Sequence, residues 1–138
     1  MTKVYPIILT PTSDGSYCVN IPDFNSATQG ENMADAICMA RDAIGLMGIT
    51  LEDEKKPIPE PRAVSEVRIT DEENGIFGNS ESVVTLVDVN FTEYRRQNDN
   101  RTVKKNCTIP AWLCAEAERQ GVNFSRVLSE ALKEKLGV

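Results

Sequence analysis

The chain has 138 residues, 41% hydrophobic and 26% charged, which is the composition of a globular protein with one ordinary domain or two small ones. It contains no histidine, which excludes Ser-His-Asp, Cys-His and histidine-base catalysis. A nuclease that uses carboxylates and metal ions stays open on composition alone. No run approaches the ~20 apolar residues of a membrane helix. The N-terminus lacks a signal-peptide cleavage site, so we expect a cytoplasmic protein.

Charge is distributed unevenly along the chain. Residues 1–100 contain 8 Lys and Arg against 17 Asp and Glu, a net charge of −9, whereas residues 101–138 contain 7 against 4, a net charge of +3. The overall charge of −6 therefore conceals an acidic body and a basic end. This asymmetry predicts two domains with two roles, the basic one suited to meeting phosphate.

The four cysteines give no metal-binding spacing. No C-x-x-C pair occurs, and in a reducing cytosol the side chains should remain thiols. We expect small buried hydrophobic residues rather than zinc ligands, and neither a metal nor a cofactor. The residues concerned are Cys18, Cys38, Cys107 and Cys114.

The first 30 residues predict three short strands. Val4–Leu9 and Tyr17–Ile21 flank the turn sequence Ser13–Ser16, which indicates a hairpin. Pro6 in the first run favours an edge strand, because proline cannot donate to a ladder. Ser26–Gly30 is a candidate third strand.

An amphipathic helix is predicted next. Asn32 is a suitable N-cap, and Asp35 places a negative charge on the first turn. The helix should end near Gly48. Its expected core stripe is Met33, Ile37, Ala40, Ile44 and Met47.

The following segment is charged and rich in proline over Glu52–Arg62, so it cannot continue the helix. Val64–Ile69 is a candidate extended stretch, and Asp71–Ser82 a polar loop. Ser82–Val89 is the strongest strand candidate, and its β-branched run predicts a strand buried on both faces beside a parallel neighbour. The order β-β-β-α-β predicts a small sheet with a helix on one face. Asn90–Arg101 is a candidate linker or short helix.

The last residues predict one strand and two helices. In the strand Arg101–Ile109, Lys104, Asn106 and Thr108 share one face. The other face carries Val103, Cys107 and Ile109, with Lys105 as the exception. Pro110 opens a helix over Ala111–Gln120, Gly121 ends it, and Asn123 caps a second helix over Phe124–Leu136.

So short a unit cannot bury a core alone, and its single strand leaves both edges unpaired. Pairing with the same strand of a second chain solves both problems and gives a homodimeric ribbon on four helices. Such a ribbon fits the major groove of operator DNA, where Lys104, Asn106 and Thr108 could read base edges. Lys105 could reach phosphate along its stem. The helix start at Asn123, Phe124 and Ser125 offers amides to phosphate.

This C-terminal pattern resembles the ribbon-helix-helix repressors, and the whole chain is similar to HicB antitoxins. The motifs that carry the resemblance are Tyr5 in the first strand, IPDF at Ile21–Phe24, ATQG at Ala27–Gly30, and later KKNCTIP and GVNFSRVLSEAL. Some HicB proteins carry a helix-turn-helix instead, so the ribbon assignment depends on the C-terminal residues themselves.

The resemblance implies an α+β protein with a partial RNase H-like domain at 1–95, a linker at 96–101 and a ribbon-helix-helix domain at 102–138. It implies that the first domain binds and inhibits a HicA-type toxin, a small basic mRNA-cleaving enzyme, and that the second represses the chain's own operon. The chain itself is then not an enzyme. Candidate toxin contacts are Asp23, Phe24, Asp35 and Asp42, although Tyr17 and Phe24 fit a core or loop anchor better.

Two other functions remain open on sequence. A ribbon-helix-helix regulator could use its N-terminal domain to sense a small ligand; the lack of histidine argues against nickel. A degenerate nuclease would need converging carboxylates, whereas Asp23, Asp35 and Asp42 are explained by a turn, a helix start and a solvated helix face. The dimer could also assemble further.

Overall fold

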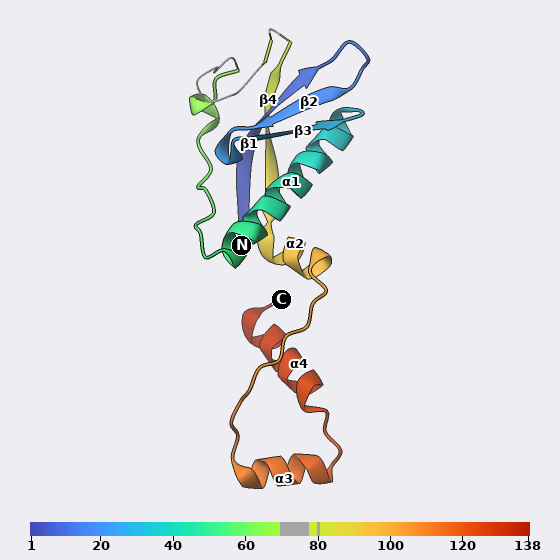
Figure 1. Ribbon diagram of the computed structural model, residues 1–138, viewed down its shortest axis with the longest axis vertical. Coiled ribbons are helices and arrows are strands. Elements are labelled where there is room, and N and C mark those ends of the chain that lie inside the picture. Colours follow the sequence, from blue (N-terminus) through green and yellow to red (C-terminus); the bar gives the residue numbers. More distant parts are fainter. Residues whose placement is uncertain (70–77, 80) are drawn as a thin grey trace. The chain divides into compact units, whose positions relative to one another are not determined.

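The computed structural model describes residues 1–69, 78–79 and 81–138. They form two compact units, Met1–Arg101 and Thr102–Val138 (Figure 1). None of the described helices is both long and apolar enough to cross a membrane. The N-terminal unit contains β1 (Thr2–Pro11), β2 (Tyr17–Ile21), β3 (Ser26–Gly30), α1 (Met33–Asp53), β4 (Val83–Asn90) and α2 (Phe91–Asn98). The C-terminal unit contains α3 (Ala111–Arg119) and α4 (Phe124–Leu136).

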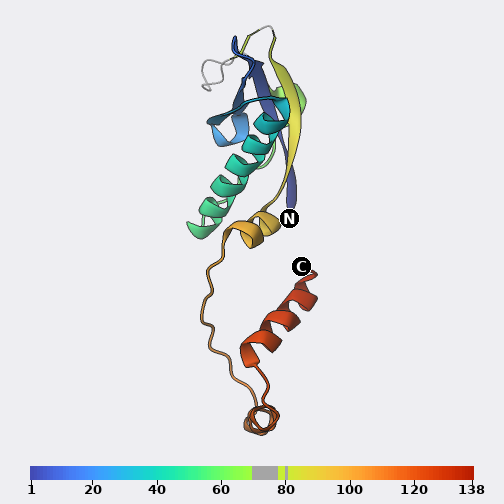
Figure 2. The same ribbon diagram turned by 90° about the vertical axis from the view of Figure 1, so that its right-hand side faces the viewer.

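The four strands form one antiparallel sheet in the order β3-β2-β1-β4, and α1 lies across one of its faces (Figure 2). This arrangement confirms the predicted β-β-β-α-β order and the helix on one face. Tyr17 and Phe24 pack against the core between sheet and helix, as expected of anchors. The core itself consists of Tyr5, Ile7, Leu9, Val19, Ile21, Ala36, Ala40, Ile44, Val87, Val89 and Phe91.

β1 is an interior strand, so the edge position predicted from Pro6 is wrong. Pairing with β2 begins only at Ile8, although pairing with β4 covers the whole stretch around Pro6. The bond from Thr12 N–H to the Ser16 carbonyl (2.9 Å) continues the β1–β2 ladder and shows that even-numbered β1 residues direct their backbone groups toward β2. The N–H that Pro6 lacks would point past the end of β2, so no ladder bond is lost.

The prediction of β4 as a strand buried on both faces beside a parallel neighbour is also wrong. β4 lies at the edge of the sheet and is antiparallel to β1. Val87 and Val89 are buried on the α1 side, whereas Val83 and Leu86 are each 50% exposed. The β-branched run therefore reflects strand propensity at a half-buried edge rather than burial on two faces.

Helix α1 begins as predicted and ends later than predicted. The Asn32 side chain accepts the Asp35 N–H at 2.9 Å and thereby caps the helix. The helix then continues through Gly48 to Asp53. A glycine inside a helix is tolerated where another element must approach closely, and this is the case here.

That other element is α2, which packs against α1 at two glycines. A Cβ on Gly48 would lie 2.1 Å from a ring carbon of Phe91, and a Cβ on Gly45 would lie 2.4 Å from the ring of Tyr94. Both distances are far below contact, so the rings occupy the space that side chains would need. The glycines of α1 thus serve packing rather than helix termination.

Ion pairs join the end of α1 to α2. Arg95 contacts Glu52 at 2.9 Å and Asp53 at 3.1 Å, and donates to the Ile49 carbonyl at 3.1 Å. Arg101 pairs with Asp99 at 2.7 Å and lowers the pKa of that carboxyl group. Residues 90–101 therefore form a helix followed by a segment tied back onto the first unit.

The segment between α1 and β4 is held by specific bonds. The Tyr5 hydroxyl donates to the Pro59 carbonyl at 2.8 Å, and burial raises the pKa of Tyr5 to about 12, so it remains a donor at neutral pH. The predicted extended stretch Val64–Ile69 instead contains a short 3-10 turn at Val64–Glu66. Most of the predicted loop Asp71–Ser82 lies outside the described residues.

The prediction that the cysteines are buried is wrong for Cys18, Cys38 and Cys107, which are exposed in the single chain, while Cys114 is partly buried. Cys18 lies on the sheet face opposite α1, in register with Thr10, and is exposed. Cys38 is exposed on α1, and Cys107 and Cys114 belong to a unit that has no core of its own. All four are free thiols.

Replacement of Gly48 tests the α1–α2 contact. Gly48→Ala should lower the free energy of unfolding by about 1–3 kcal/mol, because the methyl group overpacks against Phe91. Met39→Ala, at an exposed position of the same helix, should change it by no more than about 0.5 kcal/mol. Urea denaturation followed by circular dichroism measures both, and an equal effect of the two substitutions contradicts the packing.

Candidate functional site

The helices of the C-terminal unit begin where the sequence predicts; α4 also ends there, and α3 ends one residue early, at Arg119. Pro110 precedes α3, and Gly121 follows it with φ +71°, a left-handed conformation that favours glycine. The Asn123 side chain accepts the Arg126 N–H at 3.1 Å and caps α4. Local sequence therefore determines both helices without help from a core.

The apolar side chains of these helices are not buried in the single chain. Neither α3 nor α4 has a buried residue, and the single tryptophan, Trp112, is 71% exposed. The exposed large hydrophobic residues of the unit are Val103, Ile109, Trp112, Leu113, Val122, Phe124, Val127, Leu128, Leu132, Leu136 and Val138. Several of them line a mainly apolar hollow with Ala117 and Ala131.

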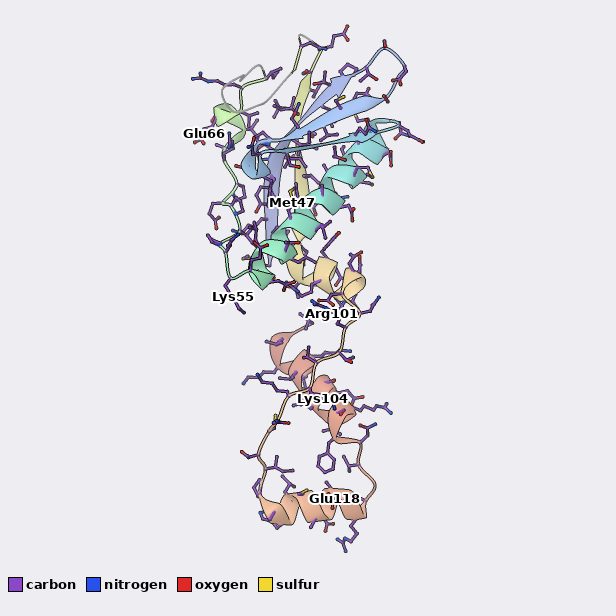
Figure 3. All side chains as sticks on the ribbon, in the orientation of Figure 1. Met47, Lys55, Glu66, Arg101, Lys104 and Glu118 are labelled. Atoms are coloured by element: carbon purple, nitrogen blue, oxygen red, sulfur yellow. The ribbon has the colours of Figure 1, made fainter. Side chains whose placement is uncertain are left out.

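The segment before α3 has no regular secondary structure in the single chain, so the predicted strand Arg101–Ile109 is not formed there. A strand requires a pairing partner, and the described part of the C-terminal unit supplies none. All residues from 101 to 110 are exposed, including Asn106 and Thr108. Lys104, labelled in Figure 3, is among them. Lys105, by contrast, lines the hollow together with Cys107 and Ile109.

The predicted phosphate contacts lie at the start of α4. Asn123 serves as the helix cap, and its side-chain oxygen is occupied by that bond. Phe124 and Ser125 are exposed in the single chain and border the hollow. The first turn of a helix has backbone N–H groups without carbonyl partners, so this position suits an anion.

In the N-terminal unit, Asp23 is a structural residue. Its side chain is only 4% exposed and pairs with Arg62, whose Nε lies 2.9 Å away. It also accepts the backbone N–H of Arg62 at 3.3 Å. Asp23 therefore fastens the proline-rich segment to the turn at Pro22–Phe24, and little of its carboxylate is open to a partner.

Phe24 and Asp35 also have internal partners. The Phe24 ring meets the Tyr5 ring edge to face, with centroids 5.1 Å apart. Asp35 accepts the Glu31 N–H at 2.9 Å beside the N-terminus of α1. Both side chains remain partly exposed, and each borders a surface hollow.

Asp42 is the most accessible of the predicted carboxylates. It is exposed and accepts the Tyr94 hydroxyl at 2.8 Å. Burial, followed by the bond to Asp42, raises the pKa of Tyr94 to about 12, so the phenol keeps its proton at neutral pH. The carboxylate is thereby oriented while it remains in contact with solvent.

Asp42 belongs to a row on the side of α1 that faces away from the sheet. Spacing of three, four and seven residues puts these side chains on one helical face. Large apolar residues alternate with acids there: Leu46 is 55% exposed and Met39 is 40% exposed. We name this row the α1 strip; it consists of Asp35, Met39, Asp42, Leu46 and Asp53.

The sequence analysis named Asp35 and Asp42 as candidate contacts but did not name Met39 and Leu46, which share their helical face. The spacing in the sequence could have identified them, because Met39 and Leu46 lie three or four residues from Asp35 or Asp42. Two hollows border the strip, one beside Asp35 and Met39 and the other beside Leu46. One is lined partly by Glu31, Asp35 and Met39, and the other by Phe24, Leu46 and Met47.

The described residues contain no cluster of His, Cys, Asp and Glu side chains that could hold a metal ion. The chain thus consists of an acidic α+β unit followed by a basic unit of two helices.

The family model described as "HicB_like antitoxin of bacterial toxin-antitoxin system" matches residues 5–132. The chain belongs to this family, whose members are antitoxins and generally not enzymes. Antitoxin HicB 1 of Photorhabdus laumondii is 43% identical over 60 residues, which cover 41% of this chain and 39% of that relative. The match thus spans about two fifths of that relative's length.

Two solved structures match almost the full length. One is described as a toxin–antitoxin complex from Streptococcus pneumoniae; its matching chain has a TM-score of 0.62 and 27% identity, with 98% of this chain and 99% of that one covered. The other is the antitoxin HicB of Burkholderia pseudomallei, with a TM-score of 0.52 and 25% identity over 98% of this chain and 97% of that one.

Substitution separates the roles of the two aspartates. Asp23→Ala removes hydrogen bonds to a charged partner in a nearly buried place and should lower the free energy of unfolding by about 1–3 kcal/mol. Asp42→Ala, at an exposed position, should change it by about 0.5 kcal/mol or less. Equal stabilities of the two variants in urea would show that the Asp23–Arg62 pair does not hold the segment.

Proposed function

We propose that this chain is an antitoxin that neutralises a HicA-type toxin through its N-terminal unit and represses its own operon through its C-terminal unit. The observation that carries the division is the contrast in burial. The first unit has its own core, whereas α3 and α4 have no buried residue. The second unit therefore needs a partner to fold stably, and the first does not.

A second copy of the chain is the partner that fits the C-terminal unit. Two copies of residues 101–109, paired antiparallel, would satisfy the strand's backbone groups and bring two sets of helices together. Lys105, Cys107 and Ile109 already border the hollow with the helix residues, so that face turns inward. The product is a ribbon-helix-helix homodimer.

The opposite face of that ribbon would read DNA. Lys104, Asn106 and Thr108 alternate with the residues of the hollow and would appear twice on the ribbon. A two-stranded ribbon enters the major groove, where amide and hydroxyl groups can contact base edges. Lys105 starts from the inward face and would reach phosphate by extending its long stem outward. The α4 start at Asn123, Phe124 and Ser125 would offer its backbone N–H groups to phosphates. Operon repression places the chain in the cytoplasm.

The N-terminal unit, as a partial RNase H-like domain, would carry the toxin. The Streptococcus pneumoniae neighbour comes from a toxin–antitoxin complex, and we transfer that partnership to this chain. The α1 strip suits a basic toxin, because Asp42 supplies charge and Leu46 supplies an apolar anchor in the same row. Charge speeds the encounter, while a few buried anchors determine affinity.

DNA binding should depend on the ribbon face. Asn106→Ala should weaken operator binding by about 1–3 kcal/mol and relax base preference. Lys104→Ala should weaken binding to all sequences and reduce its salt dependence. The measurement is fluorescence anisotropy with operator and unrelated duplexes at several salt concentrations, with Lys133→Ala, far along α4, as the control. Wild-type binding by both ribbon variants contradicts the proposal.

Toxin neutralisation should survive loss of the C-terminal unit. A fragment of residues 1–101, which keeps the Arg101–Asp99 pair, should protect cells that express the adjacent small toxin and inhibit mRNA cleavage in vitro. Leu46→Arg should abolish this protection, because it places a cation and a clash in the strip. Val64→Arg, at another exposed apolar site of the unit, is the control.

If only the full-length chain protects although the fragment is folded, toxin binding requires the C-terminal unit. If the fragment protects equally well with Leu46→Arg, the toxin binds elsewhere on the N-terminal unit. Either result overturns the corresponding part of the proposal.

A further inference from the structure

An apolar hollow lies beside the α1 strip. Its walls come from three places in the fold: the turn after β2, the second half of α1, and the proline-rich segment that follows this helix. The side chains that form most of the walls are Phe24, Asn25, Leu46, Met47, Leu51 and Pro59. Leu46 is 55% exposed and belongs to the strip as well, so the hollow and the strip are continuous.

The walls of the hollow are fixed by contacts within the chain. The Phe24 ring packs edge to face on Tyr5, and the hydroxyl group of this tyrosine donates to the Pro59 carbonyl at 2.8 Å. The Asp23–Arg62 pair, 2.9 Å long, fastens the proline-rich segment to the turn. The hollow is therefore already formed in the free chain. A preformed site binds a partner without the cost of ordering its own side chains.

The hollow suits an apolar group because its polar neighbours are already bonded. The Thr50 hydroxyl donates to the Leu46 carbonyl at 2.7 Å. The Asp23 carboxylate accepts from both the side chain and the backbone of Arg62. A polar group buried here would leave water without gaining these partners, which costs free energy. An aliphatic or aromatic side chain pays no such cost.

Charge limits the kind of partner that can cover the hollow. The adjacent strip carries Asp42 and Asp53, both exposed, and residues 1–100 have a net charge of −9. A second N-terminal unit would bring like charge to this place, whereas a basic surface is attracted. The C-terminal unit is basic too, but the proposed function uses its apolar side chains for its own assembly. Apolar side chains grouped at a charged border are typical of a contact with another protein.

We propose that the hollow receives an apolar side chain of the toxin, carried on a basic surface whose cations meet Asp42. This inference rests on the proposed function, in which the toxin lies along the α1 strip, and it locates the anchor that determines affinity there. Leu46 contacts the toxin at the border of the hollow, and the flexible Met47 side chain adapts to the anchor inside it. A buried anchor dominates the binding free energy, while the exposed charges mainly speed the encounter.

Filling the hollow from the chain's own side tests the anchor. Thr50 borders the hollow and is exposed, so Thr50→Trp should occupy the space without disturbing the core. The affinity of the full-length chain for the purified adjacent toxin, measured by calorimetric titration, should fall at least about 30-fold, as for loss of a central anchor. Thr50→Ala leaves the hollow open and should bind like the wild type. Val64→Trp places the same ring at an exposed site outside the hollow and should also bind like the wild type.

Methyl NMR of the unsubstituted chain locates the contact independently of the tryptophan variant. The chain has four methionines, and their methyl signals can be assigned by single replacements with leucine. Addition of toxin should shift the signal of Met47, which lines the hollow, and that of Met39 in the strip. The signal of Met1, exposed at the start of the chain, should not move.

Failure of this inference and failure of the proposed function give different results. If Met39 shifts and Met47 does not, or if Leu46→Arg abolishes binding while Thr50→Trp binds like the wild type, the toxin lies on the strip without entering the hollow, and this inference alone is overturned. If neither methyl signal shifts although the toxin is bound, the toxin binds elsewhere and both fall. A Met47 shift that grows with chain concentration in the absence of toxin assigns the hollow to a second copy and also overturns the inference.

Discussion

The apolar side chains of α3 and α4 need a surface to pack against, and the described part of their own unit does not provide one. Both helices are nevertheless well formed, because proline, asparagine and glycine determine their ends. Local signals thus specify the secondary structure, while burial of the apolar faces requires a partner surface, which in the proposed function is a second copy of the chain. Folding and association of this unit are then a single event, so any DNA-reading surface it builds exists only in the assembled state.

The N-terminal unit, by contrast, buries its apolar side chains within a single chain. Its sheet, α1 and α2 bury a core within one chain, and the contact of Phe91 with Gly48 joins the last helix to the first. The ion pairs of Arg95 continue this attachment to the end of the unit. A unit that folds alone can bind a partner whether or not the C-terminal unit is assembled, which makes two separable activities physically reasonable.

The sequence predicted those parts of the fold that depend on local chemistry. The hairpin, the Asn32 and Asn123 caps and the order of elements are of this kind. The sequence-based prediction failed where a residue's role depends on which element of the fold packs beside it. Pro6 is tolerated in an interior strand because β2 ends early, and Gly48 lies inside α1 at a place where the Phe91 ring fills the space that a side chain would need. The order of the strands and the packing of the helices cannot be inferred from Pro6 or Gly48 alone.

The candidate site shows the same limit. The sequence analysis named both Asp23 and Asp42 as candidate toxin contacts, but Asp23 is nearly buried against Arg62 and Asp42 is exposed near Leu46 on the same helix. A carboxylate that fastens a segment cannot be spared for a partner without a loss of stability. The acidic side chains of the N-terminal unit therefore fall into at least two groups, those held in internal ion pairs and those exposed to solvent. Only the exposed carboxylates can attract a basic partner.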